Sequence, residues 1–120
     1  MPARNDTLED RLSPYREIRI AVIGRKSGRI ISILVWFVAD IDSLYLLPVQ
    51  GSDTQWYKNV IENPLIRIDA PGAEAELQAI PITDDKGVSS VVDKFRDKYS
   101  AGDVKRYYSK FDVAVLAKAR

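Results

Sequence analysis

The sequence contains no cysteine and no histidine among its 120 residues. Without cysteine there is no disulfide, no thiolate nucleophile and no cysteine-ligated metal. Without histidine, the commonest general base, the hydrolase triad and most transition-metal sites are excluded as well. A catalyst built from the remaining residue types has to borrow its reactive group. Hydride transfer through an organic cofactor meets that condition, because the cofactor carries the electrons.

The sequence also lacks a long apolar run and a strong charge of either sign. The longest apolar stretch, Ile30–Ala39, is interrupted by Ser32 and is about half of a membrane span. The first ten residues are polar and hold no apolar signal core. With 18 basic and 17 acidic residues the net charge is +1, unlike a general nucleic-acid-binding domain. We expect a cytoplasmic protein with no nucleic acid partner and no stable membrane anchor.

The apolar pattern predicts short strands and a few helices. Several short segments alternate or are rich in β-branched residues and end in turn residues, as strands do. Ser52 and Gln55 have capping-box spacing before one helix, and Asp84 or Asp85 can cap another, whose apolar positions recur at helical spacing. Strands are expected at 17–23, 30–39, 44–49, 65–70, 74–82 and 112–117, and helices at 54–62 and from residue 85 to 99, with a helical turn or loop at 103–109.

The resulting order, β-β-β-α-β-β-α-β, predicts a mainly β fold. Short strands joined by tight turns favour a closed six-stranded antiparallel barrel with two or three short helices over a parallel sheet. A chain of this length is expected to form one domain. We expect residues 1–14 to form a polar arm or short helix ending near Ser13-Pro14, and residues 15–120 to form a single cofactor-binding domain.

The turn Gly24-Arg25-Lys26-Ser27-Gly28-Arg29 carries three cations between two glycines. Glycines let backbone N–H groups converge, and the cations supply charged hydrogen bonds, so the turn suits a phosphate or polycarboxylate tail. The spacing matches neither Walker A nor the dinucleotide fingerprint. A solvated basic hairpin turn is the plain alternative.

The segment Pro48-Val49-Gln50-Gly51-Ser52 leads into the first long helix. A strand that ends at a helix N-terminus gathers free N–H donors, which can bind an anion or a ring carbonyl. Gly51 would let a flat ligand approach the backbone, and Asn59 could bind the edge of a heterocycle. The alternative is that Trp56 and its neighbours only close the end of the barrel.

Two aromatic features complete the candidates. Trp36 lies in an apolar strand, where core packing is the default and a cofactor wall the second interpretation. Near the C-terminus an aromatic and basic patch could line a substrate mouth, stack on nucleic acid or be ordinary surface. This patch consists of Tyr99, Lys105, Arg106, Tyr107 and Tyr108.

Three segments combine into a recognisable succession. They are Gly24–Arg29 after a strand, Val35-Trp36-Phe37-Val38 with an Asp turn into Leu44-Tyr45, and Trp56-Tyr57-Lys58-Asn59 followed by Asn63-Pro64. In this order they resemble the deazaflavin-dependent nitroreductase and quinone-reductase family, which belongs to the pyridoxamine-phosphate-oxidase-like split barrels. The resemblance runs from about Ile18 to Asp69.

The resemblance implies a homodimer with a cofactor in a groove on each barrel. It assigns the phosphate-bearing tail to the basic turn, namely Arg25, Lys26, Ser27, Gly28 and Arg29. It assigns the ring to Pro48, Val49, Gln50, Gly51 and Ser52, with Trp56 and Asn59 beside it. Tyr107 or Tyr108 is the nearest counterpart of a tyrosine that faces the substrate.

The implied activity is hydride transfer from reduced coenzyme F-420, or from FMN, to a small flat acceptor such as a quinone, nitroaromatic or enone. The chain departs from the family at Ile30-Ile31-Ser32 and Leu34, where one tail-binding cation is missing, and Gln55 replaces a customary Lys or His. FMN has a shorter tail and would need fewer cations. A non-catalytic flavin-binding protein and a small nucleic-acid-binding barrel are the alternatives.

Overall fold

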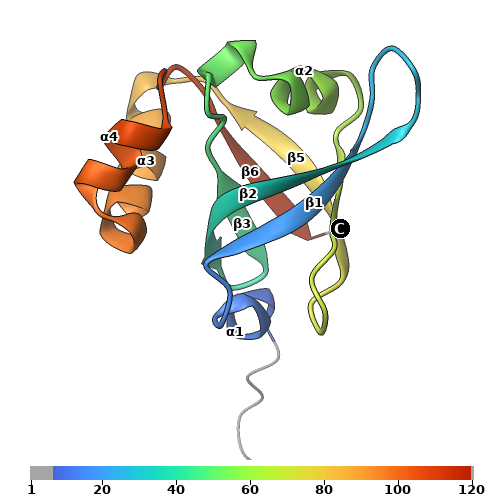
Figure 1. The fold of residues 1–120 in the computed structure, drawn as a ribbon, viewed down its shortest axis with the longest axis horizontal. Helices are drawn as coiled ribbons and strands as arrows, with labels where there is room; N and C mark the ends of the chain where they lie inside the picture. Colours follow the sequence, from blue (N-terminus) through green and yellow to red (C-terminus); the bar gives the residue numbers. More distant parts are fainter. Residues whose placement is uncertain (1–6, 120) are drawn as a thin grey trace, which may run out of the picture.

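Six antiparallel strands close into a barrel in the computed structural model, which describes residues 7–119 (Figure 1). Around the barrel the strands follow the order β1-β2-β3-β6-β5-β4. Their bounds are β1 Glu17–Ile23, β2 Ile30–Asp40, β3 Ser43–Leu46, β4 Leu65–Ile68, β5 Ala75–Ile82 and β6 Ala114–Ala119. The helices are α1 Leu8–Leu12, α2 Gln55–Glu62, α3 Asp85–Tyr99 and α4 Ala101–Tyr107, with a 3-10 turn, η1, over Gly51–Asp53. The expected six-stranded antiparallel barrel is confirmed.

Two expectations about the helix starts have different outcomes. Asp84 caps α3 as expected, because its carboxylate accepts a hydrogen bond from the Gly87 N–H at 2.8 Å. The capping box expected at Ser52 is wrong. α2 begins after Thr54, and the Ser52 hydroxyl donates instead to Asp112 at 2.6 Å.

Other element ends also differ from the sequence expectation. β3 ends at Leu46 rather than at residue 49, before Pro48, which has no N–H to donate to a strand partner. The expected turn or loop at 103–109 is helix α4, capped by the Ser100 hydroxyl, which accepts from the Asp103 N–H at 3.2 Å. Of the expected N-terminal arm, residues 8–12 form α1, and residues 1–6 lie outside the described part of the chain.

The main core fills the barrel. Residues alternate along the strands, so that the inward-facing side chains of β1 are almost fully buried while Arg19 faces outward. α2 closes one end of the barrel and α1 the other (Figure 1). Each buried large apolar side chain contributes about 1.5–3 kcal/mol to stability. The closing side chains are Trp56 and Val60 at one end and Leu8 and Leu12 at the other.

A second core lies outside the barrel, where α3 and α4 pack against it (Figure 1, left). α3 presents an apolar stripe at helical spacing, which comprises Val88, Val91, Val92, Phe95 and Tyr99. Leu47 and Ala114 meet this stripe from the barrel side. Within residues 7–119, no helix has both the length and the apolar character that a membrane span requires.

Candidate functional site

The basic turn is a closed loop between β1 and β2. The Gly24 N–H donates to Arg29 O at 2.8 Å, and the Gly28 N–H donates to Gly24 O at 2.9 Å. Gly28 has φ +71°, a backbone conformation that favours glycine, whereas Gly24 does not use positive φ. The loop therefore has a defined shape, which holds its three cations at the end of the hairpin.

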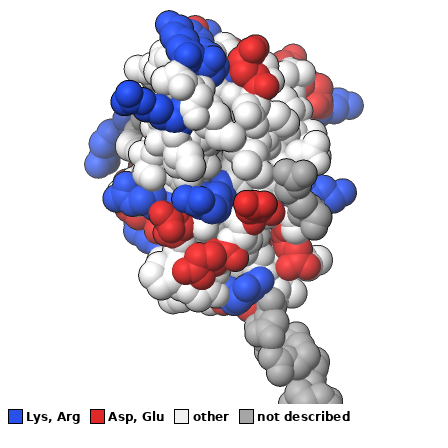
Figure 2. All heavy atoms as spheres, turned by 90° about the vertical axis from the view of Figure 1, so that its right-hand side faces the viewer, with Lys and Arg blue, Asp and Glu red and all other residues white. Residues whose placement is uncertain are grey.

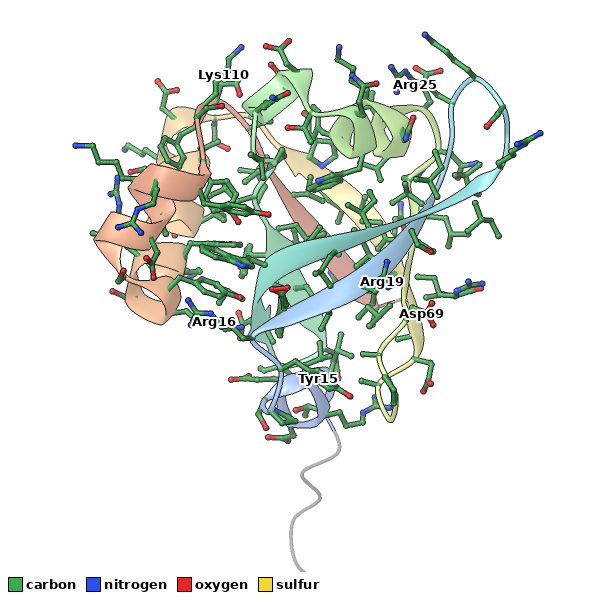
Figure 3. All side chains as sticks on the ribbon, viewed as in Figure 1. Tyr15, Arg16, Arg19, Arg25, Asp69 and Lys110 are labelled. Atoms are coloured by element: carbon green, nitrogen blue, oxygen red, sulfur yellow. The ribbon has the colours of Figure 1, made fainter. Side chains whose placement is uncertain are left out.

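Arg25 is fixed against α2 by neutral groups (Figure 3). Its Nη1 donates to Asn59 Oδ1 at 2.8 Å, its Nη2 donates to Gln55 Oε1 at 2.9 Å, and its backbone N–H also donates to Asn59 Oδ1 at 3.1 Å. Amide oxygens orient the guanidinium without neutralising it. Arg25 is thus a positive charge in a fixed position, as an anion-binding site requires.

The orientation of the Asn59 amide follows from the chemistry of its partner. Arginine can only donate, so the oxygen of Asn59 must face Arg25, and its Nδ2 group points elsewhere as a donor. Asn59 is 5% exposed and is the only buried polar or charged residue in the described chain. A ligand that contacts this amide group must therefore present an acceptor, such as a phosphate or carbonyl oxygen.

Two open pockets adjoin Arg25 and Lys26. One has a volume of about 300 Å³, and its lining contains no acidic residue. The other, of about 420 Å³, lies over α2 and includes Lys58 and Glu62. The first is lined by Gly24, Arg25, Lys26, Ser27, Ile31, Gln55 and Asn59. The structure therefore brings Arg25, Lys26, Ser27 and Asn59 together at one pocket rich in donors.

The side of the molecule that carries the hairpin has an uneven charge distribution. Figure 2 shows basic side chains at the upper left, acidic ones beside them at the upper right, a broad uncharged area beneath and a band of mixed sign lower down. Next to the basic turn, β2 carries exposed apolar side chains, since Ile30 is 62% exposed and Leu34 is 48% exposed. The basic turn thus adjoins an exposed apolar face.

The segment 48–52 lies at the same end of the barrel but has few free donors. For the segment itself the expectation of free N–H groups is wrong, because nearly every one is already used inside the protein; at the start of α2, by contrast, Thr54 provides no side-chain cap. Ser52 N–H donates to Asp112 Oδ1 at 2.9 Å. The Gln50 N–H donates to Thr54 Oγ1, and the Gly51 N–H donates to Pro48 O. The Asp53 N–H donates to Gln50 O, and the Thr54 N–H donates to Gly51 O.

Asp112 holds this segment closed. Its carboxylate accepts both the N–H and the hydroxyl of Ser52 and pairs with Lys110 at 3.7 Å. The hydrogen bond from the Ser52 hydroxyl is the main cause that lowers the pKa of Asp112, and the charge of Lys110 adds to it. Gly51, at φ +56°, leaves room for this carboxylate, which any side chain at that position would strike.

Within a single chain, the predicted aromatic residues Trp36, Tyr107 and Tyr108 do not line the pocket beside the basic turn. Trp36 stacks between Tyr99, with a centroid separation of 4.3 Å, and Tyr107, with a separation of 4.5 Å. This cluster lies beside α3 and α4, on the opposite side of the barrel from the basic turn (Figure 1). Tyr107 is 44% exposed, but Tyr108 is only 3% exposed, and burial raises the pKa of its phenol. Of the two tyrosines, only Tyr107 is placed to face a ligand.

Trp56 also lies in the interior. Its side chain is 5% exposed and packs in the barrel core with Val60, which agrees with the interpretation that it closes the barrel end. Tyr57 is buried as well but borders the larger pocket. The role of Trp56 beside a cofactor ring stays a prediction.

Comparison with known proteins identifies the family. A family model described as "Uncharacterized protein conserved in bacteria (DUF2255)" matches residues 9–115. The chain belongs to the DUF2255 family. A search of curated proteins finds no match to the sequence.

Solved structures show that the DUF2255 chain shares its fold with several proteins of low sequence identity. A conserved hypothetical protein from Mycobacterium tuberculosis is similar, with 17% identity, a TM-score of 0.73 and coverage of 100% of this chain and 86% of that one. An F-420-H2 dependent reductase has 14% identity, a TM-score of 0.67 and coverage of 86% and 94%. HutZ, a heme storage protein from Vibrio cholerae, has 12% identity, a TM-score of 0.67 and coverage of 88% and 82%. These likenesses establish the split-barrel fold that the sequence resemblance predicts.

Sequence reasoning named Asn59 as a site residue of this DUF2255 chain, but it missed that Asn59 and Gln55 hold Arg25, and it missed Asp112 altogether. Gln55 and Asn59 are four residues apart on α2 and therefore share a face, a spacing that was available in the sequence. Asp112 follows Ser52 by 60 residues, and no local pattern connects them. Gln55 and Asn59 hold the Arg25 guanidinium in a fixed position. Asp112 occupies the two donors of Ser52 that the cofactor ring was expected to meet.

Proposed function

We propose that this DUF2255 chain binds a flavin-type cofactor, coenzyme F-420 or FMN, through its phosphate-bearing tail at the basic turn. The observation that carries the proposal is Arg25, a cation fixed by Asn59 and Gln55 beside a pocket without acidic residues. Hydrogen bonds to charged groups contribute about 1.5–3 kcal/mol each, so three such contacts would supply about 4.5–9 kcal/mol, against the roughly 8 kcal/mol that micromolar binding requires. The reductase of the same fold supports this choice of ligand class.

The donor set of the pocket fits a phosphate-bearing tail. Arg25 and Lys26 would pair with its charges, while the Ser27 hydroxyl and the Asn59 amide would donate to its oxygens. Arg29, at the end of the same turn, does not line this pocket, and its part in binding the tail stays a prediction. The segment 48–52 would run beside the ring. When bound in its reduced form, the cofactor would supply a hydride to a small flat acceptor such as a quinone, nitroaromatic or enone. The chain itself would bind and orient both molecules, with no side-chain base required.

The active form in this proposal is a homodimer. Ile30 and Leu34 face outward from β2 next to the basic turn and leave an apolar surface that a second copy would cover. Size-exclusion chromatography should give an elution near twice 13.5 kDa. Replacing Leu34 by Glu should shift the protein to the monomer position, and a wild-type monomer would contradict this part of the proposal.

A second candidate is a non-catalytic flavin-binding protein. It is favoured by the closed segment 48–52, where Asp112 occupies both donors of Ser52, and by the burial of Tyr108. The heme storage protein of the same fold is consistent with a binding role for this architecture. Oxidation of the reduced cofactor by menadione or a nitroaromatic at a rate above that of the free cofactor would favour the enzyme.

The first test is a parallel titration of the purified protein with coenzyme F-420 and with FMN, followed by cofactor fluorescence. Saturable binding of one cofactor and not the other would identify it. In the double variant Arg25→Ala, Lys26→Ala, affinity should fall at least tenfold with little change in Tm. The matched control, Lys86→Ala, Lys105→Ala, removes two cations from α3 and α4 and should bind normally. Binding of neither cofactor would contradict the proposal.

A further inference from the structure

A second pocket, with a volume of about 420 Å³ and lying over α2, adjoins the pocket of about 300 Å³ beside the basic turn, here called the tail pocket. Arg25 and Lys26 line both of them. The two pockets take different residues from α2, since Gln55 and Asn59 line the tail pocket and Lys58 lines the second one. A ligand whose phosphate is held at Arg25 can therefore extend into the second pocket without leaving the protein surface. The residues that line the second pocket are Arg25, Lys26, Tyr57, Lys58, Ile61 and Glu62.

The second pocket has an excess of positive charge. Arg25, Lys26 and Lys58 are cations, and Glu62 is the one acidic residue in its lining. Within residues 7–119, none of these three cations takes part in an ion pair. Lys58 precedes Glu62 by four residues on α2, and lysine before glutamate is the weaker order for a pair at this spacing. The positive charges of the second pocket are therefore available to an anion.

Uncharged surroundings strengthen the attraction between Lys58 and an anion. Lys58 is partly buried, whereas Lys26 and Glu62 are exposed. The buried Tyr57 and the exposed Ile61 supply uncharged surface in the same pocket. Burial raises the pKa of the Tyr57 phenol, so Tyr57 adds no negative charge at physiological pH. Solvent therefore screens an anion beside Lys58 less than it screens one beside a fully exposed lysine.

We propose that the second pocket binds a further anionic group, a phosphate or a carboxylate, of the ligand whose first phosphate is held at Arg25. This inference rests on the proposed function for the position of the first phosphate. It adds that the chain selects tails with two anionic groups over a single phosphate monoester such as that of FMN. Lys58 determines this specificity, because Arg25 and Lys26 border both pockets whereas Lys58 borders only the second.

The experiment uses the full chain and two inorganic probes at constant ionic strength. Orthophosphate carries one anionic group, and tripolyphosphate carries several along its length. Titration followed by NMR of the backbone amides gives the Kd of each probe and the residues that it affects. Orthophosphate should shift the amide signals of Arg25 and Asn59, whereas tripolyphosphate should also shift those of Lys58 and Ile61 and bind at least tenfold more tightly. Unchanged Lys58 and Ile61 signals with tripolyphosphate would overturn the proposal.

Substitutions at Lys58 and Glu62 separate the second pocket from general charge attraction. In Lys58→Gln the Kd for tripolyphosphate should rise at least fivefold, while the Kd for orthophosphate stays within about twofold of wild type. Glu62→Gln should lower the Kd for tripolyphosphate, because it removes the carboxylate from the pocket. Lys86→Gln, on α3 and in the lining of neither pocket, is the matched control and should leave both Kd values unchanged. An equal rise for both probes in Lys58→Gln, or the same rise for tripolyphosphate in Lys86→Gln, would overturn the assignment.

The anion titrations distinguish a failure of this inference from a failure of the proposed function. If orthophosphate binds at Arg25 but tripolyphosphate binds no more tightly, the tail pocket stands and the second anion site is wrong. If tripolyphosphate binding depends on Lys58 while neither FMN nor coenzyme F-420 binds, the proposed cofactor is wrong and the site for two anionic groups stands.

Discussion

The substitution Asn59→Asp tests the site with the smallest possible change in shape. Asn59 Oδ1 accepts from Arg25 Nη1 at 2.8 Å and from its backbone N–H at 3.1 Å, and a carboxylate oxygen can keep both hydrogen bonds. The change neutralises Arg25 and replaces the amide donor with a second acceptor. Two opposite unit charges about 4 Å apart interact by about 4 kcal/mol at an effective dielectric constant near 20, and a ligand anion would now compete with this pair.

The expected loss in tail affinity is about 1.5–3 kcal/mol, which corresponds to a Kd raised about tenfold to a hundredfold. Tm should stay within a few degrees of wild type, because the buried carboxylate is paired with Arg25. Fluorescence titration with FMN and coenzyme F-420 measures the affinity, and differential scanning calorimetry measures Tm. Asn63→Asp is the control, since it makes the same charge change at the C-cap of α2, one turn away from Arg25's partner.

Two results would refute this reasoning. An unchanged Kd in the Asn59→Asp protein would mean that Arg25 does not anchor the ligand. An equal loss in Asn63→Asp would mean that overall charge, rather than the fixed guanidinium, determines the affinity.

Three further predictions concern contacts outside the pocket. The pKa of Asp112 is lowered in the folded protein, so its hydrogen bonds with Ser52 stabilise the fold above about pH 4. This stabilisation is lost as the pH falls through the lowered pKa. The difference in Tm between wild type and Asp112→Asn should therefore be present at pH 7 and shrink below pH 4. Tyr99→Phe should reduce the free energy of unfolding by about 1–3 kcal/mol in urea titrations, because the hydroxyl accepts from the Phe37 N–H at 3.0 Å in a buried position; an unchanged midpoint would contradict it. Ser100 has φ +82° and ψ +149°, a conformation that favours glycine, so Ser100→Gly should raise the free energy of unfolding by about 0.5–1 kcal/mol. A lower Tm would show that the loss of the Ser100 hydroxyl cap on α4 outweighs the relief of backbone strain.

Most of the fold could be predicted from the sequence because each strand carries its own signal. Alternation along 17–23 and 74–82 and the run of β-branched and aromatic residues in 30–39 mark the strands, and the apolar stripe of α3 marks the helix outside the barrel. The error at the start of α2 falls where a distant residue changes a local preference. Ser52 has the spacing of a helix cap, but Asp112 offers it a charged acceptor. A charged hydrogen bond is stronger than a neutral cap, so the helix begins later.

The candidate site could be predicted only as a composition. The basic turn is visible as three cations between two glycines, yet the same letters describe a solvated loop. What distinguishes the two is the contact between Arg25 and Asn59, which are 34 residues apart. It forms because the hairpin end meets the face of α2 that carries Gln55 and Asn59, and a sequence pattern states neither the meeting nor its geometry.

The same limit applies to the aromatic residues and has the opposite consequence. Trp36 and Tyr107 are attractive ligand contacts as residue types, but the barrel places them against α3 and α4, in a stack that already satisfies Trp36 on two sides. Stacked pairs of this kind contribute about 0.5–1.5 kcal/mol beyond area burial, which a ligand must replace before it can use the indole. Within residues 7–119, by contrast, no carboxylate forms an ion pair with the cations of the basic turn. The polar end of the cofactor is therefore the part for which this chain is preorganised, and the Arg25 variants test the function more directly than any aromatic substitution.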